Sequence, residues 1–289
     1  MNGSSFIAVD WGTTNRRAWV IEDGRVVDNI RDATGILAVL PGGFASEVSA
    51  LRARFLDRPM VLAGMVGSNR GWIDAGYVPC PATLETLAAG LAEPEAGVRV
   101  VPGVKALVDG RGDVMRGEEV QLLGAVAAGQ APGDALLCQP GTHCKWARMD
   151  GGALATFSTA MTGELFSLLR DHALIGAAMT TPAARGTAFD QGVARSGEGD
   201  LSTALFGVRA DSLLAVRDDV EAASYVSGLL IGADARAHVV PGDTVHLLAD
   251  AALGALYSAA IRSIGGQVVA IDSNAAFIAG IIRLWEFAP

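Results

Sequence analysis

Residues 6–19 read FIAVDWGTTNRRAW, an apolar strand that runs into a Gly-Thr turn and out into a second strand. Residues 136–147, LLCQPGTHCKWA, repeat this device, with Gly141 in the place of Gly12. Each copy then reaches a hairpin signal rich in aspartate and glycine. A duplicated strand-turn-strand predicts two similar half-molecules whose turns offer backbone N–H groups to one anion. A nucleotide's phosphate chain is the natural common ligand.

The composition indicates an ordinary globular chain with large cores. It has 289 residues, of which 51% are hydrophobic, and a mean hydropathy of +0.35. This length predicts two domains of ordinary size. The longest apolar runs, 122–128 and 226–231, are far shorter than the roughly 20 residues of a membrane-spanning helix. The N-terminus shows no secretory signal, and three cysteines make neither a disulfide framework nor a metal quartet. We therefore expect a cytoplasmic protein that does not bind a membrane.

The charge distribution argues against nucleic acid as a partner. The formal net charge is −9, and the sequence contains no run of lysine or arginine. An acidic protein that binds an anion must place its few positive groups deliberately or recruit a metal cation. Lys105 and Lys145 are the only lysines, and Lys145 follows the second Gly-Thr turn. This lysine either contacts a phosphate or lies near the turn by chance, and both interpretations stay open.

Hydrophobic periodicity predicts alternating strands and helices along the whole chain. Strands are expected at 5–10, 17–22, 25–30, 59–64, 98–104, 134–138, 244–249 and 266–271. The second half is expected to repeat the opening meander up to Ser158, with a strand at 153–158. Helices are expected at 44–56, 113–128, 163–171, 187–195, 200–206, 217–237, 251–264 and 274–286. A glycine- and proline-rich segment ends the helix at 113–128, so the predicted domains are residues 1–130 and 131–289.

The Gly-Thr turns differ from the common phosphate-binding loops. A P-loop or a dinucleotide fingerprint leads from its glycines into a helix, whereas here residues 17–21 form another strand. A hairpin would therefore cradle the phosphates. Asp10, at the end of the first strand, is placed to hold Mg²⁺ through water. The alternative, that Asp10 only caps a tight loop, is weakened by the second copy of the turn.

Residues 10–19 resemble the opening of the 2-keto-3-deoxygalactonate kinases, a family of the actin, chaperone and sugar-kinase ATPase superfamily. Four further blocks resemble that family in order: GMVGSNRGW at 64–72, DVMRGEE at 113–119, QPGTHCKW at 139–146 and MTGELF at 161–166. The resemblance implies an α/β fold of two ribonuclease-H-like (actin-like ATPase) domains with an interdomain active-site cleft. It implies that the helix at 274–286 packs back on the first domain, and that the chain phosphorylates the terminal hydroxyl of 2-keto-3-deoxy-galactonate with ATP.

Phosphoryl transfer to a sugar needs phosphate donors, a cation, a base and a grip on the substrate. The residues predicted to bind ATP, with Asp10 for the metal, are Gly12, Thr13, Thr14, Gly141, Thr142, His143, Lys145, Gly228 and Gly232. The candidate bases are Asp113, Glu118 and Glu119. Asp113 can equally cap the predicted helix, and the two glutamates can simply favour its first turn. The choice among the three stays open.

An arginine suits the substrate's carboxylate, because its fork pairs with two oxygens at once. Arg70, in a loop after a buried strand, is the first candidate, and Arg16 is the second. The other predicted substrate ligands are Ser68, Asn69, Trp72, Thr162 and Glu164. A plain surface loop around Arg70, and a plain helix start at 162–164, are the alternatives.

Several alternatives remain at the level of function. An exopolyphosphatase-like phosphohydrolase would use water as the acceptor and would not need Arg70. A nucleotide or sugar-acid sensor would bind its ligands without turnover. Asp250 either contacts adenosine or caps the helix that follows it, so the nucleotide preference is open. Homodimerisation is also open.

Overall fold

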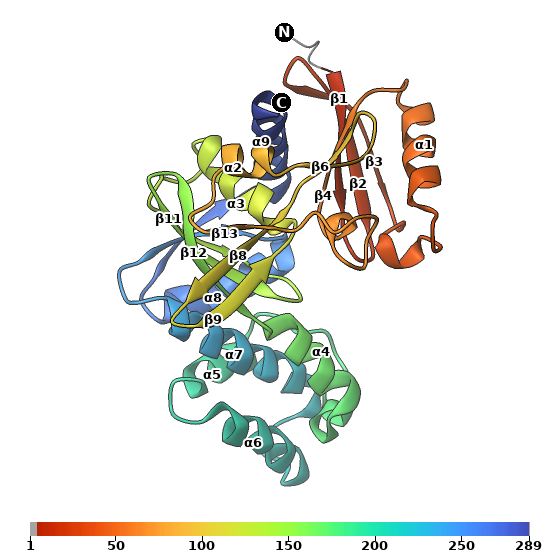
Figure 1. The fold of residues 1–289 in the computed structure, drawn as a ribbon. Coiled ribbons are helices and arrows are strands. Elements are labelled where there is room, and N and C mark those ends of the chain that lie inside the picture. Colours follow the sequence, from red (N-terminus) through yellow and green to blue (C-terminus); the bar gives the residue numbers. More distant parts are fainter. Residues whose placement is uncertain (1–4, 289) are drawn as a thin grey trace. The chain divides into compact units, whose positions relative to one another are not determined.

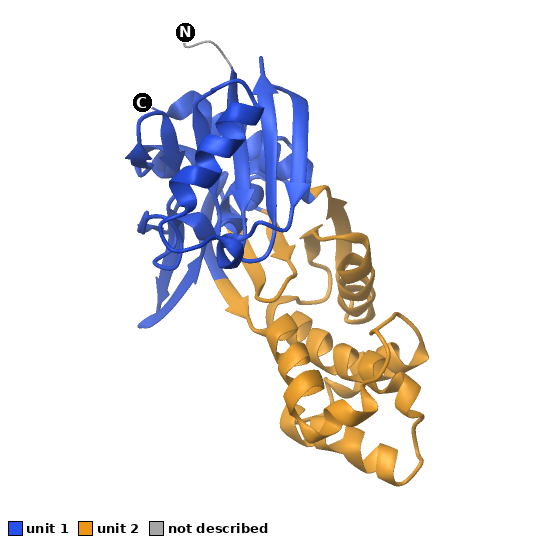
Figure 2. Cartoon of the chain, turned by 90° about the vertical axis from the view of Figure 1, so that its right-hand side faces the viewer, with its two compact units in different colours: residues 1–134, 149–157, 273–289 blue, residues 135–148, 158–272 orange. Residues whose placement is uncertain are grey.

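The structure is a computed structural model that describes residues 5–288. It divides into two compact units (Figure 2). Unit 1 comprises residues 1–134, 149–157 and 273–289, and unit 2 comprises residues 135–148 and 158–272. The chain leaves unit 1 after Asp134, rather than after residue 130. Among the described residues, no helix is both long and apolar enough to cross a membrane.

Unit 1 is built on a six-stranded sheet in the order β3-β2-β1-β4-β7-β6 (Figure 1). Its strands are β1 (Ser5–Trp11), β2 (Arg16–Glu22), β3 (Arg25–Asp32), β4 (Met60–Ala63), β6 (Ala92–Glu95) and β7 (Val98–Val100). Its helices are α1 (Phe44–Arg54), α2 (Leu84–Ala89), α3 (Glu118–Ala127) and α9 (Ser273–Phe287), with short 3₁₀ turns at Ile36–Ala38 and Met65–Gly67. β1 pairs antiparallel with β2 and parallel with β4.

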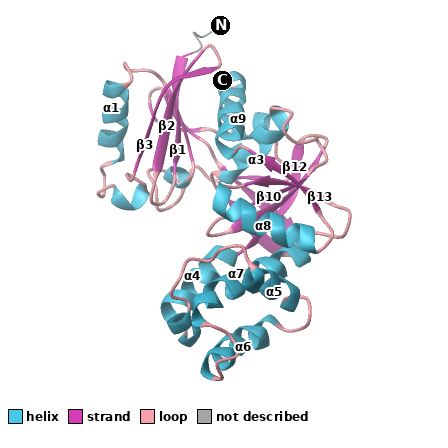
Figure 3. Ribbon diagram, turned by 180° about the vertical axis from the view of Figure 1, so that it is seen from behind, coloured by secondary structure: helices cyan, strands magenta, loops and turns pink. Residues whose placement is uncertain are grey.

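Helices cover both faces of this sheet. Because successive side chains of a strand point to opposite faces, β1 contacts helices on both. Helix α1 lies along one face of the sheet (Figure 3). Ile7 and Val9 of β1 share a buried cluster with Val48 of this helix. On the other face, Phe6 stacks on Trp285 of α9, with ring centroids 4.7 Å apart. Both faces of β1 are thereby shielded from water, which explains why its sequence is apolar almost throughout.

A second, three-stranded sheet of unit 1 corrects the predicted helix at 113–128. It has the order β5-β8-β9, from β5 (Tyr77–Pro79), β8 (Gly103–Val108) and β9 (Arg111–Met115). The predicted strand at 98–104 is divided between β7 and β8. Asp109 and Gly110 both have positive φ, at 52° and 76°, as the tight turn of a β-hairpin requires. Asp113 therefore lies in a strand and does not cap a helix.

Unit 2 repeats the sheet order of unit 1. Its sheet contains β10 (Leu136–Gln139), β11 (Cys144–Asp150), β12 (Ala153–Ala160), β13 (Thr244–Leu248) and β14 (Gln267–Ile271), in the order β12-β11-β10-β13-β14. Residues Met149–Phe157, which end β11 and begin β12, are grouped with unit 1. β10 pairs antiparallel with β11 and parallel with β13, as β1 does with β2 and β4. This duplicated order confirms the predicted α/β, ribonuclease-H-like fold class.

The helices of unit 2 form two packed groups. They are α4 (Thr162–His172), α5 (Thr187–Arg195), α6 (Leu201–Leu213), α7 (Asp219–His238) and α8 (Ala251–Ser263), with a 3₁₀ turn at Leu174–Ala178. Residues of α5, α7 and α8 share a core with β10, β11 and β13. The other face of α7 packs with α6 and the 3₁₀ turn in a helical cluster. The long helix α7 thus belongs to both cores.

Candidate active site

The first Gly-Thr turn connects β1 to β2 and is held by backbone contacts. The N–H of Gly12 donates to the carbonyl of Asn15 at 2.9 Å, while Thr13 and Thr14 are exposed. The segment after β3 packs against the turn through Gly35. A Cβ atom on Gly35 would lie 2.4 Å from the carbonyl oxygen of Thr13. Only glycine permits this close approach, so the turn is fixed in shape while its tip stays open.

Asp10 lies beneath this turn and pairs with Arg17 across the hairpin. The carboxylate and the guanidinium are 2.7 Å apart, and Arg17 also donates to Asn274 of α9 at 2.7 Å. Burial raises the pKa of Asp10, and the neighbouring Arg17 opposes this shift. Asp10 is therefore a largely buried carboxylate whose charge is held by one arginine.

Arg16 has structural partners, which weigh against its predicted role as a second carboxylate grip. Its guanidinium is buried and pairs with Asp32 and Glu47, each at 2.9 Å. The ring of Trp11 lies 5.0 Å from the guanidinium carbon. These contacts use the fork of Arg16 to join β2 to β3 and α1, so we do not assign it to the substrate.

The loop after β4 presents Arg70 to solvent. Gly64 has φ of +96°, and a Cβ there would lie 2.8 Å from the carbonyl of Trp11. Ser68 is buried, and its hydroxyl donates to the carbonyl of Met65 at 2.7 Å. Trp72 packs against the core of unit 1. Arg70 is exposed, as is Asn69, and the guanidinium of Arg70 has no ion pair within residues 5–288.

The acidic segment at 113–119 places its three carboxylates in different environments. Asp113 lies on β9, where its carboxylate accepts from the N–H of Val114 at 2.7 Å. Glu118 opens α3, is half-buried, and accepts from the N–H of Arg116 at 3.2 Å. Glu119 is fully buried, and its Oε1 has no partner among the described residues. Burial, reinforced by Glu118, raises the pKa of Glu119 to about 8.

Close contacts of Gly117 and Gly64 place the segment 113–119 next to Asp10. A Cβ on Gly117 would lie 3.1 Å from the Cα of Gly64, and a Cβ on Gly64 would lie 3.4 Å from Oδ1 of Asp10. Gly117 has φ of +106°, a conformation that favours glycine. The start of α3, with Glu118, thus lies close to the end of β1 within unit 1.

The second Gly-Thr turn connects β10 to β11 and is backed by the start of α4. The carbonyl of Thr142 accepts from the N–H of Glu164 at 2.9 Å. A Cβ on Gly163 would lie 2.3 Å from the carbonyl of Gly141, so this helix can approach only through a glycine. Nε2 of His143 and Oε2 of Glu164 are 2.7 Å apart on the surface. The structure brings these two predicted site residues together.

Lys145 does not lie at the tip of this turn. This residue is 4% exposed, and its Nζ donates to the hydroxyl of Thr159 at 2.9 Å. In the register of the sheet it opposes Gln139 on β10. The ammonium group is therefore held inside unit 2, and we do not assign it to a phosphate.

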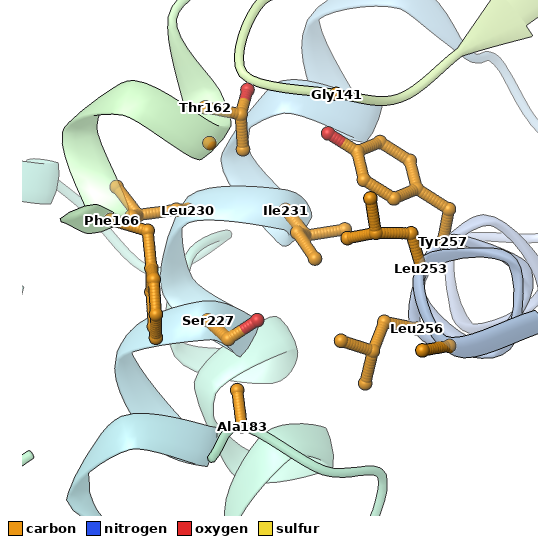
Figure 4. Close-up of a pocket in the computed structure, with 12 residues that line it drawn as sticks. Gly141, Thr162, Phe166, Ala183, Ser227, Leu230, Ile231, Leu253, Leu256 and Tyr257 are labelled. Carbon is orange, nitrogen blue, oxygen red and sulfur yellow. The ribbon is translucent and has the colours of Figure 1, made fainter. Parts of the chain in front are cut away.

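A pocket of about 190 Å³ opens beside the second turn, within unit 2 (Figure 4). Its walls are mostly apolar and come from α4, α7, α8 and the segment before α5. The lining residues are Gly141, Thr162, Gly163, Phe166, Ala183, Ser227, Leu230, Ile231, Ala252, Leu253, Leu256 and Tyr257. An apolar cavity that ends at a phosphate-type turn suits a flat, partly apolar group linked to an anion.

Asp234 holds the hydroxyls of two residues that line this pocket, and no local signal in the sequence marks it. Its buried carboxylate accepts from the hydroxyls of Thr162 and Tyr257 and from the indole N–H of Trp146, each at 2.8 Å. His238 stacks on Trp146, with ring centroids 5.0 Å apart. Because the Thr162 hydroxyl donates to Asp234, its predicted contact with a substrate hydroxyl is not favoured.

Gly228 and Gly232 have a packing role in place of the predicted nucleotide contact. A Cβ on Gly228 would lie 2.1 Å from the carbonyl of Phe189, and one on Gly232 would lie 2.4 Å from the hydroxyl of Ser196. These glycines let α7 approach α5, one helical turn apart on the same face. Asp250 caps α8 by accepting from the N–H of Leu253 at 2.9 Å, so the capping alternative is confirmed.

The chain is similar to sugar-acid kinases over nearly its whole length. The sequence model of the 2-keto-3-deoxy-galactonokinase family matches residues 10–284. A probable 2-dehydro-3-deoxygalactonokinase of Rhizobium meliloti (strain 1021) is 38% identical over 292 residues, which cover 96% of this chain and 95% of the relative. The 2-dehydro-3-deoxygalactonokinase of Escherichia coli (strain K12) is 36% identical over 283 residues, covering 96% of each.

A solved structure extends this similarity to the fold. The crystal structure of a Sinorhizobium meliloti protein of the 2-dehydro-3-deoxygalactonokinase kind superposes with a TM-score of 0.90 at 36% identity. The superposition covers 96% of this chain and 97% of that one.

Proposed function

The chain belongs to the 2-keto-3-deoxy-galactonokinase family, and from that premise we propose that it transfers a phosphoryl group from ATP to the terminal hydroxyl of 2-keto-3-deoxy-galactonate. The products are the 6-phosphate and ADP. The observation that carries the proposal is the family match across residues 10–284. The relatives are named as kinases, so the hydrolase and sensor alternatives are not favoured.

The nucleotide is assigned to unit 2, where the pocket and the second turn adjoin. The apolar walls suit the base, and the turn at 141–143 offers backbone N–H groups to phosphate oxygens. His143 adds a side-chain donor at that turn, and Glu164 orients it. The turn of unit 1, at 12–14, exposes Thr13 and Thr14 and is proposed, taken by itself, as a second phosphate-binding turn.

Asp10 is the residue that fits a metal ion. Mg²⁺ is held in phosphate sites by one or two carboxylates together with waters and the substrate's own oxygens, so a single carboxylate at the phosphate turn meets its needs. When bound, the ion would neutralise charge on the phosphates. Among residues 5–288, no group of three or more metal-binding side chains occurs, so we assign only the Asp10 carboxylate. Arg17 holds that carboxylate in place.

Glu118 is our choice for the base that takes the proton of the acceptor hydroxyl. It lies at the start of α3, which Gly117 brings next to Gly64 and Asp10. Glu119 has a raised pKa of about 8, so it is mostly protonated at neutral pH and cannot accept a proton there. Asp113 lies apart from this helix start, on the hairpin of the small sheet.

Arg70 is the proposed grip on the substrate's carboxylate, because its guanidinium is exposed in the loop that Gly64 holds against Trp11. We expect Arg70→Ala to raise KM for the keto-deoxy acid at least about tenfold, roughly 1.4 kcal/mol. ATP affinity measured without the acid should stay within about twofold. Arg70→Lys should restore the activity only partly, because an ammonium keeps the charge and loses the fork.

A neutral sugar alcohol of matching length is the control, because wild type and Arg70→Ala should use it equally poorly. An unchanged KM for the acid would remove Arg70 from the site. The reaction itself is tested by ³¹P NMR of the purified product. A phosphomonoester signal coupled to the protons of the terminal carbon is expected, and inorganic phosphate as the only product would contradict the kinase assignment.

We place this reaction in the cytoplasm, where ATP and a sugar acid under catabolism are both available. Homodimerisation remains a prediction that light scattering of the purified protein can test.

A further inference from the structure

The pocket of unit 2 is lined by three residues that carry hydroxyl groups, and their surroundings differ. Thr162 and Tyr257 both donate to the buried carboxylate of Asp234. Ser227, on α7, is 5% exposed, and within residues 5–288 its hydroxyl makes no hydrogen bond. Figure 4 shows this hydroxyl directed into the pocket, between Ile231 and Leu256.

The Ser227 hydroxyl opens onto the pocket, so a ligand or a water there can complete its hydrogen bond. Since the hydroxyls of Thr162 and Tyr257 both donate hydrogen bonds to Asp234, Ser227 is the hydroxyl side chain best placed to bond a polar atom of the pocket's ligand.

From this arrangement we propose that Ser227 hydrogen-bonds the polar edge of the nucleobase and so helps to determine which nucleotide binds. The inference rests on the proposed use of ATP. A purine has apolar faces and a rim of nitrogen donors and acceptors. Phe166, Leu230 and Leu256 offer apolar walls to such faces. A serine hydroxyl can donate to a ring nitrogen or accept from an exocyclic amine.

The geometry of α7 explains why serine stands at this position. Gly228 and Gly232 face α5, as their close contacts with Phe189 and Ser196 show. Ser227, Leu230 and Ile231 lie on the neighbouring side of the helix and line the pocket. The helix therefore uses its glycines for packing and the adjacent serine for the ligand.

The test is equilibrium binding of nucleotides to the full chain, measured by calorimetry without sugar acid. Ser227→Ala should weaken ATP binding roughly fivefold to tenfold. Competition by inorganic tripolyphosphate, which lacks a nucleoside, should be unchanged. The melting temperature should not fall, because the Ser227 hydroxyl makes no hydrogen bond within residues 5–288. Ser263→Ala is the matched control, since that hydroxyl donates to the Ala260 carbonyl at 2.8 Å at the end of α8.

Analogues of ATP separate the base from the ribose, which also carries neutral polar groups. If Ser227 contacts the base, 2′-deoxy-ATP and 3′-deoxy-ATP should lose as much affinity on Ser227→Ala as ATP does. If either deoxy analogue is insensitive to the substitution, the partner is a ribose hydroxyl and the inference is wrong. ATP binding within twofold of wild type in Ser227→Ala would also overturn it, while kinase activity would still support the proposed function. No ATP binding by the wild-type chain would overturn both.

Discussion

The two Gly-Thr turns share one backbone plan but differ in the side chains around them. The turn of unit 1 has Asp10 beneath it, paired with Arg17, and lies near the start of α3 with its two glutamates. The turn of unit 2 has Gln139 in the corresponding place and opens onto an apolar pocket. The two turns therefore share the strand-turn-strand backbone and differ in the side chains that surround it.

From this difference we expect the first turn to contribute to the chemical step and the second to nucleotide binding. Carboxylates that can hold a metal or accept a proton gather around the first turn. A hydroxyl-lined apolar pocket and the His143–Glu164 pair gather around the second. Substitutions of the carboxylates near the first turn should therefore act mainly on kcat, whereas those near the second turn should act on nucleotide binding.

The largest effect is expected from Asp10→Asn. Losing the carboxylate at the metal position should lower kcat by about 10²–10³-fold, because several kcal/mol of charge stabilisation depend on the cation. Circular dichroism and thermal melting should show an intact fold. In unit 2, Gln139→Met should keep kcat within about tenfold, since an amide has no charge to hold the metal. Equal losses in the two variants would show that the turns do not differ in this way.

Glu118→Gln comes next in size. The loss of a general base should lower kcat by about 10²-fold with little change in KM. Asp113→Asn is the comparison within the same segment and should stay within about threefold of wild type, because that residue lies on the hairpin. Steady-state kinetics with saturating ATP measure both. A larger loss of kcat in Asp113→Asn than in Glu118→Gln would identify Asp113, on the hairpin, as the base.

Loss of the His143–Glu164 pair should raise KM for ATP and leave KM for the sugar acid unchanged. His143→Ala and Glu164→Ala should each raise KM for ATP about fivefold, and the double variant should do no worse than either, since the two side chains act as one unit. Initial rates across an ATP series test this double-mutant cycle. Additive losses, or a raised KM for the sugar acid, would return Glu164 to its predicted role as a substrate ligand.

The last prediction concerns stability, not turnover. The pKa of Glu119 is raised from 4.5 to about 8, so between these pH values the unfolded chain releases a proton that the folded chain keeps. This residue's contribution is therefore fully present below pH 4.5 and is lost as the pH rises to about 8, at up to about 1.4 kcal/mol per pH unit. In Glu119→Gln, this decrease of the free energy of unfolding with rising pH should be absent, because glutamine does not titrate.

Urea unfolding at several pH values tests the stability prediction. The stability of Glu119→Gln relative to wild type should grow from pH 5 to pH 8. Glu85→Gln, on the exposed side of α2, should show no such trend. A constant difference across that range would mean that Glu119 titrates near its ordinary value.

Local patterns in the sequence were enough to predict the turns and most of the elements around them. The Gly-Thr motifs, the strands beside them and the cap of α8 at Asp250 depend on neighbours within a few residues. The hairpin at 103–115 was missed, although Asp109-Gly110 is a turn signal, because the apolar run at 98–104 was interpreted as one strand.

Long-range contacts account for what the sequence could not reveal about the site. Asp234 meets Trp146 and Thr162, which are 88 and 72 residues away along the chain. No short motif marks such a cluster. Arg16 looked available beside the turn, but its partners Asp32 and Glu47 come from other elements. Whether a polar residue is free or already paired depends on the tertiary structure.

Release of ADP by the purified chain, followed with and without 2-keto-3-deoxy-galactonate, tests the central claim most directly. With ATP and Mg²⁺ present, we predict fast ADP formation that requires the sugar acid and matches it mole for mole. ADP release that proceeds equally without the acid would indicate a hydrolase, and the absence of release in its presence would contradict the assignment as a kinase.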